Sequence, residues 1–122
     1  MEGKFAFVAE DDMFAQNVVK MILKTLKVDC TVHVDGNEVF EAWKNKQGQC
    51  SIVLMDIHMP NCDGYEAAKK MRNYEKEKGW KQTKIYALSG DDDSETKAQV
   101  VSSGMNGLLK KPLNPGQLAT LL

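Results

Sequence analysis

The sequence predicts an α/β protein of the (βα)5 type, a doubly wound parallel five-stranded sheet with helices on both faces. Two observations support this class. Short apolar runs alternate along the chain with longer segments that carry helical periodicity, and this alternation favours a parallel sheet. The 122 residues also fit one domain, without an internal repeat, a linker or a low-complexity tract. We therefore expect residues 1–122 to form a single domain.

The first two strand–helix units are expected at residues 4–9 and 13–26, and at 30–34 and 38–46. The first helix should bury a face on which apolar residues recur every four positions: Phe14, Val18, Ile22 and Leu26. The second strand alternates polar and apolar residues, which is typical of a half-buried strand near a sheet edge. We expect Asp35-Gly36-Asn37 to break the chain before the second helix, and Gly48 to stop that helix.

The third unit begins with a continuous apolar run at 52–55, which indicates a strand covered on both faces. Its helix should run from Gly64 to just before Gly79, with Tyr65, Ala68 and Met71 facing inward. The second half of this helix, residues 75–78, interleaves opposite charges and is expected to be a solvated extension.

The fourth unit is a strand at 84–88 and a helix that stops at Gly104 and is capped by one residue of Asp91-Asp92-Asp93-Ser94. The fifth is a strand at 107–110 and a helix from Asn114-Pro115, a capping residue followed by proline at the first helical position. The sequence ends on apolar residues, which favours a chain excised from a longer protein over a natural short end.

Composition excludes several classes of function. The net charge of −1 gives no general attraction to nucleic acid or anionic membrane, and only Arg72 among the 16 basic residues is an arginine. No apolar run is long enough to enter a membrane, and the first residues lack a signal peptide core. Cys30, Cys50 and Cys62 are widely spaced, so we expect reduced thiols and a cytoplasmic location, although a longer parent could be membrane-anchored.

Acidic side chains stand where two of the apolar runs end. Glu10 and Asp11 follow the first strand, and Asp56 follows the third. The carboxyl ends of parallel strands meet at one crevice, so these groups should converge. Close carboxylates repel by about 4 kcal/mol at an effective dielectric of 20, which calls for a compensating cation. Their oxygens, with backbone carbonyls, suit Mg²⁺ better than zinc.

Neighbouring residues have simpler interpretations. Asp12 is a reasonable N-cap for the first helix, but that role does not explain Glu10 and Asp11. His58 and Cys62 lack a second pair of ligands, so we do not expect a soft-metal site there.

A counter-charge and a hydroxyl complete the expected pocket. Lys111 precedes Pro112, whose ring stiffens the backbone, and its flexible stem could reach Asp56 or a phosphate attached to it. Ser89 supplies a hydroxyl donor at the end of the fourth strand, and Gly90 lets the backbone approach a phosphate closely.

Five segments, in this order and over nearly the whole chain, resemble the receiver domain of two-component response regulators. They are Val8-Ala9-Glu10-Asp11-Asp12, Leu54-Met55-Asp56-Ile57-His58-Met59-Pro60, Asp63-Gly64-Tyr65-Glu66-Ala67, Ala87-Leu88-Ser89-Gly90 and Leu109-Lys110-Lys111-Pro112-Leu113. Each segment alone is a weak signal, and the five in register are a strong one. The turn after Asp56 and the Gly-x-Glu-Ala segment look most like receivers attached to hybrid histidine kinases. The resemblance implies a flavodoxin-like strand order 2-1-3-4-5.

The resemblance also implies roles for individual residues. Asp56 would be the phosphoacceptor, taking its phosphoryl group from a histidine kinase or a histidine phosphotransfer protein. Glu10, Asp11, Asp56 and the backbone carbonyl of His58 would hold Mg²⁺. Ser89 would be the switch hydroxyl and Lys111 the phosphate-binding lysine. Such a domain catalyses its own phosphorylation and the hydrolysis of the acyl phosphate, as part of a signalling phosphorelay.

Alternatives stay open at this stage. The same fold could serve as a phosphorylation-independent interaction module, although such a module would have no reason to keep all five polar groups. Leu108 stands where the family often has an aromatic residue, and Gly90 where it has a small alanine-like one, so the mode of output is open. A flavodoxin-like cofactor site lacks its phosphate loop after the first strand, and a haloacid-type phosphatase would need Asp at position 58.

Overall fold

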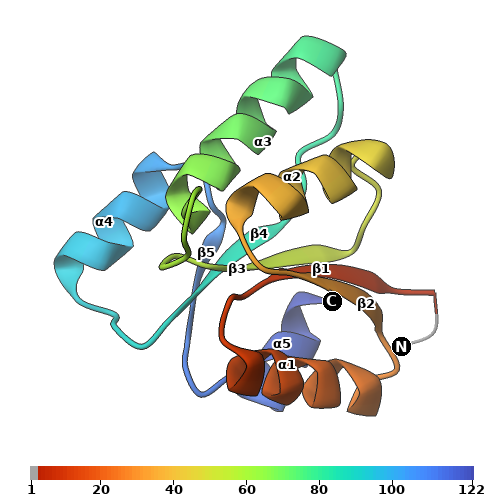
Figure 1. Cartoon of the computed structure of the whole chain (residues 1–122), viewed down its shortest axis with the longest axis vertical. Helices are drawn as coiled ribbons and strands as arrows, with labels where there is room; N and C mark the ends of the chain where they lie inside the picture. Colours follow the sequence, from red (N-terminus) through yellow and green to blue (C-terminus); the bar gives the residue numbers. More distant parts are fainter. Residues whose placement is uncertain (1–2) are drawn as a thin grey trace.

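The computed structural model describes residues 3–122 and confirms the (βα)5 prediction (Figure 1). All strand pairs are parallel, and the sheet order is β2-β1-β3-β4-β5. In chain order the elements are β1 (Phe5–Ala9), α1 (Met13–Thr25), β2 (Asp29–His33), α2 (Gly36–Asn45), β3 (Ile52–Asp56), α3 (Gly64–Lys78), β4 (Ile85–Ser89), α4 (Ser94–Ser102), β5 (Gly107–Lys110) and α5 (Pro115–Leu121).

Helices cover both faces of the sheet. Figure 1 shows α1 and α5 together on one side and α2, α3 and α4 on the other. Each side has its own apolar core. Val19 and Leu23 of α1 pack with Leu118 of α5, whereas Trp43 of α2 packs with Met71 of α3. The strand β3 is buried along its whole length, as its apolar run predicted, and β2 is a half-buried edge strand.

Every helix begins at an Asp or Asn side chain. Asp12, Asp35, Asp63, Asp93 and Asn114 each accept a hydrogen bond from the backbone amide three residues later. These bonds satisfy amides that would otherwise lack partners at a helix start. They also explain a correction: α2 starts at Gly36 rather than at 38, because Asp35 caps it directly. Four strands differ from their predicted ranges by one residue at one or both ends, and β5 matches.

The buried face of α1 differs from the prediction. Phe14 is 78% exposed, whereas Val19 and Leu23 are the buried residues of this helix. A four-residue step exceeds one helical turn by about 40°, so a row of four such residues drifts by about 120° around the helix. Phe14, at one end of the row, therefore leaves the face that meets the sheet.

The predicted solvated extension of α3 is also wrong at Glu75. This side chain is 2% exposed, because it lies one turn after the buried Met71 on the same face. Its two oxygens accept bonds from Arg72 Nη1 at 3.0 Å and from the Thr83 amide at 2.7 Å. The Thr83 hydroxyl in turn accepts a bond from the Trp43 indole at 3.1 Å. Burial of this charge is thus compensated by a paired cation and a hydrogen-bond network.

Two sequence expectations about the class of protein can be placed on the structure. The three cysteines are free thiols. Within residues 3–122, none of the helices has both the length and the apolar character that crossing a bilayer requires.

Candidate functional site

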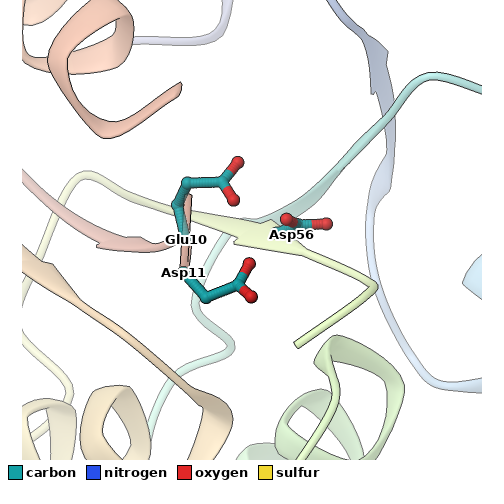
Figure 2. A group of neighbouring side chains, drawn as sticks. All are labelled: Glu10, Asp11 and Asp56. Atoms are coloured by element: carbon teal, nitrogen blue, oxygen red, sulfur yellow. The ribbon is translucent and has the colours of Figure 1, made fainter. Parts of the chain in front are cut away.

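Three carboxylates meet at the carboxyl ends of β1 and β3. The two strands are neighbours, with Ala9 paired to Met55, so the residues that follow stand side by side. One oxygen each of Glu10, Asp11 and Asp56 lies within 4.8 Å of the other two (Figure 2). Glu10 and Asp56 are buried, whereas Asp11 is exposed. The convergence expected from strand ends is confirmed.

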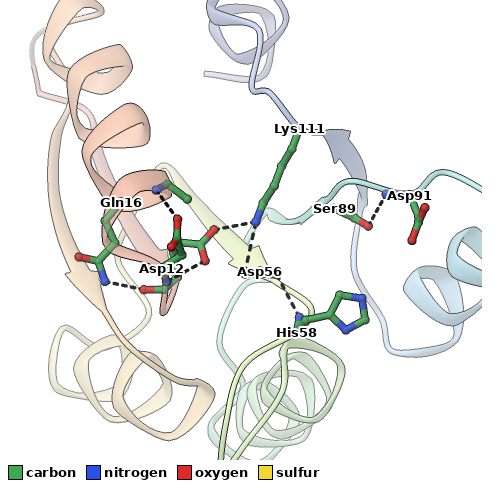
Figure 3. A network of polar contacts seen from close by, with 9 residues as sticks. Asp12, Gln16, Asp56, His58, Ser89, Asp91 and Lys111 are labelled. Atoms are coloured by element: carbon green, nitrogen blue, oxygen red, sulfur yellow. Dashed lines mark hydrogen bonds and ion pairs between the residues drawn. The ribbon is translucent and has the colours of Figure 1, made fainter.

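Lys111 neutralises the buried part of this cluster. Its ammonium group lies 2.8 Å from Glu10 Oε1 and 3.3 Å from Asp56 Oδ2 (Figure 3). Burial alone would lower the pKa of Lys111, but the pairing with Glu10 and Asp56 outweighs it and raises the pKa above its usual value. The backbone amide of Lys111 donates to the carbonyl of Ser89 at 2.8 Å, which fixes the loop that follows β5 against β4. The peptide bond between Lys111 and Pro112 is cis.

Every polar group of Glu10 has a hydrogen-bond partner. Its backbone amide donates to the carbonyl of His33, and its carbonyl accepts a bond from the side-chain amide of Gln16. One carboxylate oxygen binds Lys111 and the other accepts the amide of Asp12 at 3.2 Å. Burial, and then the Asp56 carboxylate, raise the pKa of Glu10 although Lys111 opposes them. The site therefore stabilises added positive charge.

Asp56 is fixed from two sides. One carboxylate oxygen accepts the backbone amide of His58 at 3.0 Å, and the other is the partner of Lys111. The first residue of α3 packs directly beneath it: a Cβ atom at Gly64 would stand 2.5 Å from the carbonyl oxygen of Asp56. Only a glycine permits so close an approach between the helix and the strand end.

Ser89 lies at the end of β4 in the same crevice and is 2% exposed. Its hydroxyl oxygen accepts the backbone amide of Asp91 at 3.0 Å, so it is tied to the loop before α4 (Figure 3). The sequence located Ser89 correctly but gave no sign of this bond. The metal role of the His58 carbonyl stays a prediction. Neither His58 nor Cys62 joins a metal-ligating group among residues 3–122.

The donor set fits a hard divalent cation. Glu10, Asp11 and Asp56 offer carboxylate oxygens and no sulfur or imidazole nitrogen, which suits Mg²⁺ and disfavours zinc. Lys111 pairs with Glu10 and Asp56, and Asp11 adds a third carboxylate to the cluster. Asp11 is the exposed member, so its carboxylate stays accessible from solvent.

An apolar groove of about 310 Å³ opens beside the carboxylates. Glu10 and Lys111 form the wall that it shares with the acidic cluster, and the rest is lined by Phe14, Ala15, Val18, Val19, Leu88, Pro112 and Leu113. Two further apolar residues of α1, Met13 and Met21, are 75% and 69% exposed, although neither lines the groove. Sequence reasoning missed this surface because it assigned Phe14 to the core.

Comparison with known proteins gives one consistent family. A family model described as the response regulator receiver domain matches residues 6–122. The relatives include the peroxide stress-activated histidine kinase mak2 of Schizosaccharomyces pombe, 33% identical over 120 residues, and the hybrid signal transduction histidine kinase A of Dictyostelium discoideum, 36% identical over 120 residues. Each alignment covers 97% of this chain and 5% of the relative, so the chain spans a small part of the proteins it matches.

Solved structures agree with this family. The receiver domain of sensor histidine kinase PA1611 from Pseudomonas aeruginosa has a TM-score of 0.85 at 25% identity, over 98% of this chain and 93% of that one. That structure has a magnesium ion coordinated in its active site cleft. A chain in the co-crystal of Saccharomyces cerevisiae phosphotransfer protein Ypd1 with the receiver domain of Ssk1 has a TM-score of 0.85 at 28% identity, over 95% of this chain and 83% of that one.

Proposed function

This chain belongs to the response regulator receiver domain family and is a receiver domain of the two-component phosphorelay, and we propose that Asp56 is its phosphoacceptor. The observation that carries the proposal is the position of Lys111, whose ammonium group pairs with Glu10 and Asp56, the two buried acids of the cluster that also contains Asp11. A nucleophilic carboxylate, two further acids and a cation at one crevice are the groups that phosphoryl transfer to an aspartate requires.

The proposed reaction transfers a phosphoryl group from a histidine of the partner to Asp56. The Asp56 oxygen forms a bond to phosphorus in line with the P–N bond, which breaks and leaves its electron pair on the partner's imidazole. Lys111 pairs with Asp56 before transfer and can follow the charge onto an equatorial phosphoryl oxygen. Ser89 can supply a hydroxyl donor to another of these oxygens by giving up its bond to the Asp91 amide.

We assign the metal site to Mg²⁺, held by Glu10, Asp11, Asp56 and the backbone carbonyl of His58. The chemistry that the bound ion supplies is neutralisation of the negative charge on the phosphoryl oxygens. Support comes from the all-oxygen ligand set of the chain and from the ion bound in the related PA1611 receiver. Water would later hydrolyse the acyl phosphate, so that the domain returns to its starting state.

The proposed partner is a histidine kinase or a histidine phosphotransfer protein, and the proposed setting is cytoplasmic. The Ssk1 receiver domain, similar to this chain, is crystallised with the phosphotransfer protein Ypd1. We further propose that the chain is the receiver module of a hybrid histidine kinase, because its relatives include several hybrid signal transduction histidine kinases of Dictyostelium discoideum. The apolar groove supports docking on this side, since Lys111 lines it and also contacts Asp56.

The test is intact-mass analysis after incubation with acetyl phosphate and Mg²⁺, with Asp56→Asn as the parallel sample. We expect one added phosphoryl group on the wild type and none on the variant. Asp63→Asn is the matched control, because Asp63 is a helix cap near the site whose side chain bonds only the amide of Glu66 among the described residues. Label that persists on Asp56→Asn would place the nucleophile elsewhere. A wild type that takes no label would favour the phosphorylation-independent interaction module.

A further inference from the structure

The carboxylate of Asp11 depends on its backbone for its position. Among residues 3–122 no side chain or amide makes a hydrogen bond or ion pair with it, in contrast to Glu10 and Asp56. A metal ligand that is not held by its own contacts can be positioned only by the peptide units on either side of it. Whatever fixes those two units therefore sets the geometry of the third acid in the cluster.

Gln16 holds the first of those units by its side chain. Its side-chain Nε2 donates at 2.6 Å to the carbonyl oxygen of Glu10, which belongs to the peptide unit before Asp11 (Figure 3). The unit after Asp11 is held through the Asp12 amide, which donates to Glu10 Oε2 at 3.2 Å. The backbone amide of Gln16 donates at 2.9 Å to the carbonyl oxygen of Asp12, one peptide unit further along. The backbone bond belongs to the first turn of α1 and would form with any residue other than proline at position 16. The side-chain bond is specific to the amide, and it ties α1 to the end of β1.

We infer that Gln16 is a positioning residue for the metal site, acting on Asp11 and Glu10 through the backbone without touching the ion. The inference rests on the proposed function, because it takes Glu10 and Asp11 as the Mg²⁺ ligands. Residues that orient metal ligands from outside typically change metal affinity by about 10–100-fold when they are replaced. A purely structural role, satisfying a buried carbonyl, would instead change the melting temperature and leave the affinity for Mg²⁺ unaltered.

Two substitutions separate these possibilities. Gln16→Met keeps the length of the side chain and removes the donor. Gln16→Glu also removes the donor at neutral pH but adds a negative charge near the cluster, which by electrostatics alone would tighten Mg²⁺ binding. Asn17→Asp is the matched control, because it adds the same charge at the next, exposed position and breaks no hydrogen bond seen among residues 3–122.

The measurement is the dissociation constant for Mg²⁺ by isothermal titration calorimetry, with melting temperatures recorded in EDTA. We expect both Gln16 variants to weaken Mg²⁺ binding by about tenfold or more, and Asn17→Asp to leave it unchanged or tighter. Affinities within about twofold of wild type in both variants, or equal weakening by Asn17→Asp, would overturn the role of Gln16 alone. A wild type that does not bind Mg²⁺ would overturn the metal site and this inference together. If Gln16→Met fails to fold, Gln16→Glu decides the question.

Discussion

Replacing Lys111 by methionine should expose the repulsion that this lysine suppresses. The oxygens of Glu10 and Asp56 lie within 4.8 Å of each other, and two unit charges at that separation repel by about 3 kcal/mol at an effective dielectric of 20. The Lys111 side chain is 33% exposed, so water screens part of the effect. We expect the free energy of unfolding to fall by about 2 kcal/mol, or about 8 °C in melting temperature for a domain of this size.

The assay is thermal unfolding at neutral pH in EDTA and again in millimolar Mg²⁺. The bound ion replaces the missing positive charge in the folded state only, so we expect the variant to bind Mg²⁺ and to gain more stability from it than the wild type does. Lys110→Met is the control. Its ammonium lies 3.8 Å from Asp92 and both side chains are more than half exposed, so the change should stay below about 0.5 kcal/mol. Loss of Mg²⁺ binding in Lys111→Met, or equal destabilisation by Lys110→Met, would refute this account of the site.

Three further outcomes are expected. Phe14→Ser should slow phosphoryl transfer from a phosphohistidine partner by about tenfold and leave the rate of labelling by acetyl phosphate unchanged, because Phe14 is exposed and lines the groove. Equal slowing of both rates would contradict docking of the partner at the groove. Gly64→Ala should lower the free energy of unfolding by about 1–3 kcal/mol and should also reduce labelling by acetyl phosphate, since the added Cβ would displace the Asp56 carbonyl. Gly90→Ala adds a Cβ in open space and should be tolerated in both assays. Hydrogen bonds from the first turn of α2 lower the pKa of Asp35 below 3.8, so the contribution of Asp35 to stability is present above pH 3.8 and is lost as the pH falls through the folded pKa. In urea unfolding measured at a series of pH values, Asp35→Asn should therefore reduce the loss of stability at acid pH. An unchanged loss would show that other groups produce it.

The sequence predicted the parts of the fold that depend on local pattern. Continuous apolar character identified β3 as a strand buried on both faces, and the Asn114-Pro115 pair located the start of α5. The convergence of Glu10, Asp56 and Lys111 was also predictable, because a parallel sheet brings the carboxyl ends of its strands to one edge whatever their separation in sequence.

The remaining features depend on tertiary contacts that a single sequence does not reveal. A four-residue step placed Phe14 on the same row as Leu26, but only the docking of α1 on the sheet shows which part of that row is covered. Glu75 looks like one of several surface charges until Arg72 and the Thr83 amide are seen around it. Gln16 carries no signal in its own pattern, since its contact is to a backbone carbonyl that every residue possesses.

The ion pair between Glu10 and Lys111 joins residues separated by 101 positions along the chain. Glu10 follows the first strand and Lys111 follows the last one, so the pair can close only when β5 has joined the sheet that contains β1. A nascent or C-terminally truncated polypeptide would display the acids without their lysine, and its carboxylates would repel instead of pairing. Phosphorylation at Asp56, as proposed above, would therefore require that the last strand of the sheet be in place.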